Sequence, residues 1–175
     1  YPKLLDKGIG GLRSDLQEKL KEQPDNNFYK AGIQCLDIFV DCASHLQQDA
    51  REQMASADEK RQKELERICQ ALENIKEKKP GTFHEAMQLF WLFALLAGVI
   101  NYGRLDDYLG PYLVADLKSG RLTDEEAYRY IHSLWTMIEN RRTTVNGRII
   151  VGGKGRKHPK EADVFLHIAM KVAKN

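Results

Sequence analysis

The chain has 175 residues and a nearly even charge balance, with 27 basic and 25 acidic side chains. With charges this evenly balanced, the protein has no strong excess of positive charge that would indicate binding to a nucleic acid or to a membrane surface. The longest uncharged apolar run, from Leu89 to Ile100, is well short of the roughly 20 residues that span a bilayer. No secretory signal opens the sequence. We therefore expect a cytoplasmic protein with no nucleic-acid and no membrane partner.

The three cysteines, Cys35, Cys42 and Cys69, lie on segments with helical spacing and form no Cys-x-x-Cys pair. An odd number of thiols without such a pair is typical of a reducing compartment. Cys35 and Cys42 share one face of a helix, but the sequence supplies no histidine or acidic residue that would complete a zinc site with them. We expect no metal in this chain.

Apolar residues at helical spacing predict three helices in the first half of the chain. The first covers 8–22 and ends at Gln23-Pro24-Asp25, the second covers 26–55, and the third covers 58–78. The third helix is rich in charge and has only a thin apolar stripe, as is typical of a helix with one face in solvent. Residues 26–78 are expected to form an antiparallel helical hairpin.

A break at Lys79-Pro80-Gly81 precedes a fourth helix over 83–100, which Thr82 and Glu85 begin as a capping box. This helix is apolar nearly all round, so it requires cover on all sides. Too few partners exist within the chain, and exposed hydrophobic surface is expected here. Because the sequence also opens without an initiator methionine, we expect it to be an excerpt of a longer protein, truncated at both ends.

Shorter elements follow in the second half. The pattern predicts a helix over 105–118 that contains Pro111, and a capping box at Thr123 begins another helix that ends near Asn140. A short buried strand is predicted over 147–152, followed by a last helix after His158-Pro159. The predicted fold class is therefore mainly α with one short strand.

Two local patterns are similar to known binding or catalytic motifs, but each lacks a residue that its motif requires. The glycine-rich run over 152–157 lacks the Gly-Lys-Ser/Thr end of a phosphate-binding loop, so we interpret it as a flexible turn. His84-Glu85 would need a second histidine where Gln88 stands to form a zinc protease motif. The remaining histidines are isolated. Residue spacing alone thus indicates no nucleotide, no metal and no reaction.

Three segments carry a family resemblance. Pro80-Gly81-Thr82-Phe83-His84-Glu85-Ala86-Met87-Gln88 resembles the Thr-Phe-His-Glu-Ala-x-Gln segment of glycyl radical enzymes of the pyruvate formate-lyase type. Gly103-Arg104-Leu105-Asp106-Asp107-Tyr108-Leu109-Gly110-Pro111-Tyr112 resembles their Gly-Arg-x-Asp-x-Tyr-x-x-Pro-Tyr segment, and the match continues through Asp116-Leu117 to Gly120-Arg121-Leu122-Thr123-Asp124-Glu125-Glu126-Ala127. The segments occur in the family's order.

The resemblance implies that residues 1–175 are part of a single pyruvate formate-lyase-like domain. The hairpin 26–78 would precede core helices and a first barrel strand over 80–175, and the parent fold would be a ten-stranded α/β barrel. Two departures indicate a divergent branch. Lys154 to Asp163 replaces the family's Gly-x-Asp-Ala-x-Asn-Glu run, and the connection from Trp135 to the strand is shorter. The substrate therefore stays open.

The resemblance also implies a mechanism for the parent, a C–C lyase or dehydratase of small polar metabolites. An activating enzyme with S-adenosylmethionine and an iron-sulfur cluster generates a glycyl radical, which oxidises a cysteine to the thiyl radical that attacks the substrate. Neither the cysteine loop nor the glycine loop occurs in these residues, so this chain holds no catalytic residue and no cofactor and should be inert alone. Its implied partners are the rest of the parent polypeptide, the activating enzyme and a second copy in a homodimer.

By the same resemblance, Tyr102 and Tyr108 are expected to face the substrate. The alternative is that both tyrosines merely pack between helices with satisfied hydroxyls. Arg104 is expected to hold the loop through the carboxylate of Asp106 or Asp107, because a short polar break between helices needs its charges satisfied. Together with His84, these three residues are expected to be structural neighbours of the site.

The sequence also leaves a second class of function open. The chain could be a non-catalytic helical interaction module centred on the hairpin 26–78. Such a module would have a self-sufficient core. A cysteine-containing loop and a late Arg-Val-x-Gly-Tyr segment in the continuing gene would favour the enzyme, and a stop codon would favour the module.

Overall fold

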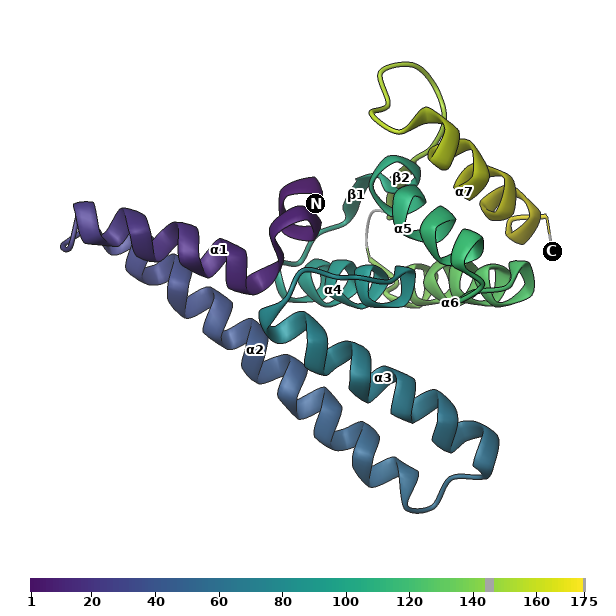
Figure 1. The fold of residues 1–175 in the computed structure, drawn as a ribbon, viewed down its shortest axis with the longest axis horizontal. Coiled ribbons are helices and arrows are strands. Elements are labelled where there is room, and N and C mark those ends of the chain that lie inside the picture. Colours follow the sequence, from purple (N-terminus) through teal and green to yellow (C-terminus); the bar gives the residue numbers. More distant parts are fainter. Residues whose placement is uncertain (144–146, 175) are drawn as a thin grey trace. The chain divides into compact units, whose positions relative to one another are not determined.

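The computed structural model describes residues 1–143 and 147–174, which form two compact units. Unit 1 comprises Tyr1–Pro80 and Gln88–Leu96, and unit 2 comprises Gly81–Met87 and the described residues from Ala97 onward. Helices make up most of both units, and the strands of the described chain form one two-stranded sheet in unit 2 (Figure 1). The mainly helical fold class is thereby confirmed.

Unit 1 is built on three long helices, α1 (Pro2–Glu22), α2 (Asn27–Met54) and α3 (Glu59–Glu77) (Figure 1). The side chain of Asn26 accepts from the backbone N–H of Phe28 at 3.0 Å and begins α2. Asp58 begins α3 in the same way, accepting from the Arg61 N–H at 2.8 Å. These caps satisfy backbone donors that have no partner within a helix, so the local sequence sets both helix starts.

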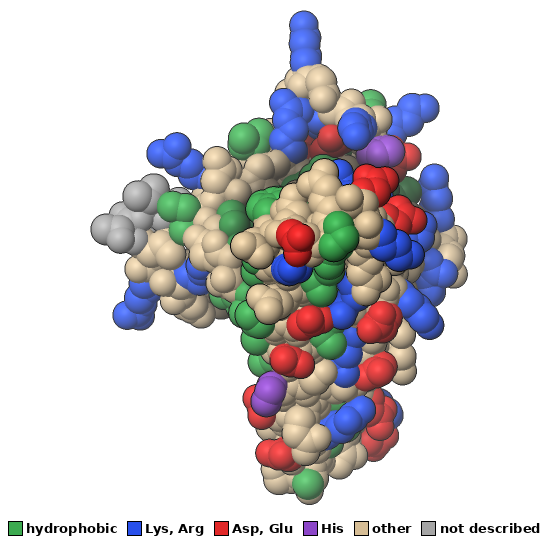
Figure 2. All heavy atoms as spheres, turned by 90° about the vertical axis from the view of Figure 1, so that its left-hand side faces the viewer, with side chains coloured by type: hydrophobic (Ala, Val, Ile, Leu, Met, Phe, Trp, Pro, Cys, Tyr) green, Lys and Arg blue, Asp and Glu red, His purple; other side chains and the backbone are tan. Residues whose placement is uncertain are grey.

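The interface between α2 and α3 mixes an apolar core with one polar contact. Ala50 and Leu65 are buried in this core. The Gln47 side chain, also buried, donates to the Cys69 carbonyl at 2.9 Å and accepts from the Lys76 ammonium at 2.8 Å. Figure 2 shows acidic and basic side chains interspersed on the outer surface of the hairpin. Its charges therefore form a solvated face.

Helix α1 begins earlier than the predicted start at Gly8. It starts at Pro2, and Gly8 inside it has non-helical backbone angles, with φ of 66°. A Cβ atom at Gly8 would lie 2.5 Å from the Lys79 backbone nitrogen. The left-handed φ and this close approach both require glycine, so Gly8 kinks the helix rather than beginning it.

Helix α4 (Phe83–Leu96) belongs to both units. Its capping box is present, since the Glu85 N–H donates to the Thr82 hydroxyl at 3.2 Å and the Glu85 carboxylate accepts from the Gly81 N–H at 2.7 Å. Its last turns leave Leu95 and Leu96 partly exposed, as expected for an all-apolar helix with too few partners. The helix ends before the predicted Ile100.

Unit 2 continues with two strands and three helices: β1 (Asn101–Arg104), α5 (Leu105–Ser119), α6 (Asp124–Asn140), β2 (Arg148–Ile150) and α7 (Pro159–Val172) (Figure 1). The strands are parallel, and Gly103 lies opposite Ile149. The prediction of a single strand was wrong, because β1 was interpreted as a break. Its four residues include a glycine and pair only with a segment more than 40 residues later, which local periodicity does not reveal.

Asp116 connects two of the segments that carry the family resemblance. Its buried carboxylate accepts from the backbone N–H of Phe83, the first residue of α4, at 2.7 Å. The other carboxylate oxygen lies 2.8 Å from the Arg121 guanidinium. A carboxylate at a helix N-terminus satisfies an unpaired donor and complements the helix dipole. Asp116 thus fixes the start of α4 on the end of α5.

Within the described residues, no helix is long and apolar enough to cross a bilayer. The same residues contain no cluster of three or more histidine, cysteine, aspartate or glutamate side chains with the proximity that a metal ion requires.

Candidate functional site

The turn from β1 into α5 brings together five of the six residues predicted at or near the site: Tyr102, Arg104, Asp106, Asp107 and Tyr108. Gly103 within it has φ of 64°, in the left-handed region that favours glycine. The Asn101 side chain accepts from the Gly103 N–H at 3.2 Å. The positive φ of Gly103 and its hydrogen bond to Asn101 therefore define the backbone immediately before α5 begins.

Tyr102 is enclosed by other residues of unit 2 and is 1% exposed. A Cβ atom at Gly147 would lie 2.6 Å from Cε2 of the Tyr102 ring and 2.7 Å from Cγ2 of Ile138. The Tyr102 hydroxyl accepts from the Arg141 guanidinium at 3.0 Å, and the same guanidinium donates to the Val99 carbonyl. The ring and the hydroxyl are both fixed.

Tyr108 is attached directly to Tyr102. Its hydroxyl donates to the backbone carbonyl of Tyr102 at 2.7 Å, and this contact is buried. The Tyr108 side chain is 9% exposed. The two tyrosines predicted to face a substrate are thus one hydrogen-bonded pair, in which the first turn of α5 holds the end of β1.

Asp106 is fully buried and holds the segment after β2. Its Oδ2 accepts from the Gly152 N–H at 2.7 Å and lies 3.7 Å from the Arg156 guanidinium. Its Oδ1 is buried and has no hydrogen-bond partner in the described part of the chain. The cation beside Asp106 is therefore Arg156. Of the two carboxylates expected to partner Arg104, Asp107 is the one on which its charge acts. The Arg104 Nη1 is buried without a hydrogen-bond partner among the same residues.

Asp107 holds the other end of that segment, accepting from the His158 N–H at 2.9 Å. Burial by itself raises the pKa of Asp107. The backbone N–H groups of His158 and Lys157 outweigh it, and the positive charge of Arg104 acts in the same direction, so the pKa lies below its ordinary value. The charged form of Asp107 is the one that the fold stabilises.

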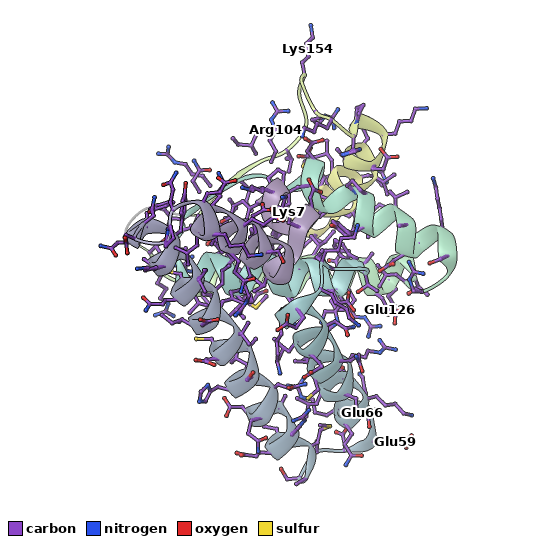
Figure 3. All side chains as sticks on the ribbon, turned by 60° about the vertical axis from the view of Figure 1, so that its left-hand side comes forward. Lys7, Glu59, Glu66, Arg104, Glu126 and Lys154 are labelled. Carbon is purple, nitrogen blue, oxygen red and sulfur yellow. The ribbon has the colours of Figure 1, made fainter. Side chains whose placement is uncertain are left out.

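The glycine-rich segment 152–158 is consequently a braced loop. Adjacent carboxylates bind its first and last backbone N–H groups, and Arg156 donates to the Gly153 carbonyl at 3.0 Å and to Asp163 at 2.6 Å. Lys154 projects from its tip (Figure 3). The interpretation of a flexible turn overlooked these contacts, because the two carboxylates lie 46 and 51 residues before the groups that they bind.

His84, the sixth predicted residue, lies on α4, where its ring stacks on Tyr130 of α6 with centroids 5.0 Å apart. It is thus a packing residue between two helices. Sequence reasoning missed Arg141, Gly147 and Arg156, which complete the surroundings of Tyr102 and Asp106. Only weak signals in the sequence could have indicated them. Arg141 is a basic residue at the end of a predicted helix, and Gly147 is one of the glycines that flank the predicted strand.

Comparison with known proteins assigns this arrangement to a family. The family model described as pyruvate formate lyase-like matches residues 1–175. The chain is 30% identical over 158 residues to a probable dehydratase, YbiW, of Escherichia coli, covering 79% of this chain and 19% of the relative. It is 29% identical over 152 residues to an isethionate sulfite-lyase of Bilophila wadsworthia, covering 77% of this chain and 18% of that protein.

The fold agrees with a crystal structure of a glycyl radical enzyme from Archaeoglobus fulgidus. The TM-score is 0.81 at 20% sequence identity, and the match covers 98% of this chain and 26% of that one. The chain therefore spans about a fifth of the length of its curated relatives. Since the family model covers every residue, this chain belongs to the pyruvate formate lyase-like family.

Proposed function

We propose that this chain is part of a glycyl radical enzyme, a dehydratase or C–C lyase of a small polar metabolite that works in anaerobic metabolism in the cytoplasm. The observation that carries the proposal is the family match over the whole chain. The names of the relatives support a dehydratase and, more broadly, a lyase, since one is a probable dehydratase and another a sulfite-lyase. A formate acetyltransferase activity is a further candidate within this proposal.

The catalytic cysteine and the radical glycine belong, in this proposal, to sequence outside the chain. The chain matches only 19% of the first relative, which leaves most of such an enzyme unaccounted for. The radical would be installed by an activating enzyme with S-adenosylmethionine and an iron-sulfur cluster, and it would supply the hydrogen-atom abstraction. The chain contributes no residue to that step and is inert alone.

In this proposal the chain contributes part of the wall of the substrate cavity. Tyr108 is its aromatic component, and the enclosed ring of Tyr102 supports it from within. Their hydroxyls are used for contacts within the protein, to Arg141 and to the Tyr102 carbonyl. The pair would therefore act through the shape and rigidity of its rings, and less through direct hydrogen bonds to a substrate. A dry, rigid wall suits a site that must keep water from a radical intermediate.

The test is to express the complete gene with its activating enzyme under anaerobic conditions and to record the electron paramagnetic resonance spectrum. We expect an organic radical signal that depends on the activating enzyme and S-adenosylmethionine. A panel of small diols, hydroxy acids and sulfonates then defines the substrate. The 175-residue chain alone, treated in the same way, is the control and should give no signal. A complete protein that forms no radical under these conditions contradicts the proposal.

A further inference from the structure

The loop that follows β2 concentrates positive charge. Residues 152–160 read Gly-Gly-Lys-Gly-Arg-Lys-His-Pro-Lys and contain no acidic residue. Lys154, Lys157 and Lys160 are exposed, and we name these three residues the basic edge. Among the residues that the structure describes, no carboxylate forms an ion pair with any of them. Their charges therefore face solvent and are available to a ligand.

The carboxylates near the loop already have partners within the protein. Asp106 and Asp107 hold the two ends of the loop through its backbone N–H groups, and Asp163 pairs with Arg156 at 2.6 Å. Glu161, the first acidic residue after the loop, lies in the first turn of α7, where a carboxylate offsets the helix dipole. These contacts fix the position of the loop and leave the three lysines without a counter-charge.

The basic edge lies beside the candidate site. Strands β1 and β2 are parallel, and their register aligns the last residue of each, Arg104 and Ile150. The β1–α5 turn and the loop after β2 therefore leave the sheet at the same end, where the hydrogen bond from the Gly152 N–H to Asp106 joins them. In enzymes built on parallel strands, ligands bind at the carboxyl ends of the strands. The lysines are thus placed at the end of the sheet where a substrate would enter.

We propose that the basic edge draws a small anionic substrate, one that carries a carboxylate, sulfonate or phosphate group, toward this end of the sheet. The inference rests on the proposed function, because it concerns the substrate of the complete enzyme. Lys154 extends outward from the tip of the loop (Figure 3), so its charge acts through the field in solution and not by contact with the bound substrate. A surface with one sign of charge raises the association rate of an oppositely charged ligand by about tenfold or more.

The size of the basic edge favours a small anion over a nucleic acid. Its three charges occupy a single loop, and the whole chain has a formal net charge of only +2. A nucleic acid is held by many cations that spread over a face or along a helix. A metabolite with one or two negative charges needs only a few.

Quenching of the enzyme radical by small thiols tests the inference without knowledge of the substrate. The probes are 2-mercaptoethanesulfonate, an anion, and 2-mercaptoethanol, which is neutral and has the same thiol-bearing ethyl group. Each thiol gives a hydrogen atom to the radical of the activated, complete enzyme and itself becomes a thiyl radical. The electron paramagnetic resonance signal of the enzyme therefore decays, and the ratio of the two decay rate constants, anion to neutral, measures how strongly the protein attracts an anion.

The test variant combines Lys154→Gln with Lys157→Gln and so removes two charges of the basic edge. The control combines Lys118→Gln with Lys174→Gln, which are exposed lysines at the far ends of α5 and α7. Helices of this length place them about 20 Å from the helix starts beside the loop. Circular dichroism verifies that all variants keep their helices, and a first-order rate constant does not depend on how much radical each variant begins with.

At low ionic strength we expect the ratio in the test variant to be at least about threefold below the wild-type ratio. The difference should disappear at about 0.5 M salt, where charges are screened within a few ångström, and the control should keep the wild-type ratio. An unchanged ratio in the test variant, or an equal change in the control, overturns the inference while the radical itself still supports the proposed function. A complete protein that forms no radical contradicts both.

Discussion

The hydroxyl of Tyr108 donates a 2.7 Å hydrogen bond to the backbone carbonyl of Tyr102, so the first turn of α5 locks the strand that precedes it. The contact is buried, and the Tyr102 hydroxyl in turn accepts from Arg141. The side chain of one aromatic residue thus supports the backbone of the other. Changes at either tyrosine should disturb both.

Removal of this hydrogen bond should lower stability without removing the ring. We expect Tyr108→Phe to reduce the free energy of unfolding by about 1–3 kcal/mol, because a buried carbonyl loses its donor. Urea denaturation measures the change. Tyr29→Phe on α2, a half-buried tyrosine whose ring lies 5.8 Å from the Lys19 ammonium, is the matched control and should change stability by less than about 0.5 kcal/mol. Equal effects of both changes would show that the Tyr108 contact contributes nothing.

Gly147 is required by the ring of Tyr102. We expect Gly147→Ala to cost about 1–3 kcal/mol, since the new methyl group would lie 2.6 Å from the ring and 2.7 Å from Ile138. Thermal unfolding measures the loss. Gly81→Ala is the control, because the nearest atom to its Cβ position is a flexible Glu85 oxygen at 3.6 Å. If Gly147→Ala unfolds at the same temperature as Gly81→Ala, the enclosed position of Tyr102 is wrong.

The brace on the loop 152–158 should depend on the charge of Asp106. Asp106→Asn keeps an oxygen for the Gly152 N–H but removes the buried charge beside Arg156, so we expect a loss of about 1.5–3 kcal/mol and faster hydrogen exchange at the Gly152 amide. Asp163→Asn, which removes the exposed partner of the same arginine, should cost less than about 1 kcal/mol. Unchanged exchange at Gly152 in Asp106→Asn would contradict the brace.

The lowered pKa of Asp107 predicts a pH dependence of a definite sign. A carboxyl group whose pKa is lower in the folded state stabilises the fold above its unfolded pKa, about 3.9, and this contribution is lost as the pH falls through the folded value. Asp107→Asn should therefore differ from the wild type in stability at pH 6, and the difference should shrink below about pH 4. A difference that stays constant from pH 6 to pH 3 would exclude this role.

The sequence predicted the helices well because their ends have local signals. Thr123 and Glu126 form the expected capping box, with the Glu126 N–H donating to the Thr123 hydroxyl at 3.2 Å. Pro24 follows the end of α1, and Asp58 begins α3. Each of these signals acts within four residues, so periodicity and capping chemistry suffice to find them.

The missed features depend on contacts between distant parts of the chain. Strand β1 exists because Gly103 pairs with Ile149, and Gly8 is a kink because the backbone of Lys79 approaches it. At the candidate site, the resemblance identified the residues of the β1–α5 turn but not their partners. The sequence left open whether Arg104 acts on Asp106 or on Asp107. The structure places Arg156, from the loop after β2, beside Asp106, and the charge of Arg104 acts on Asp107.

Turnover per radical in tyrosine variants of the complete, activated enzyme tests the central claim most directly. Tyr108→Ala removes the ring that we propose as part of the cavity wall, and Tyr102→Ala removes the enclosed ring that supports it. Tyr29→Phe on α2 is the control. Dividing the initial rate by the radical content from electron paramagnetic resonance separates catalysis from activation. The account predicts that both alanine variants form the radical yet lose at least tenfold in turnover per radical or change substrate preference. Wild-type turnover and preference in both variants, at unchanged radical content, would contradict it.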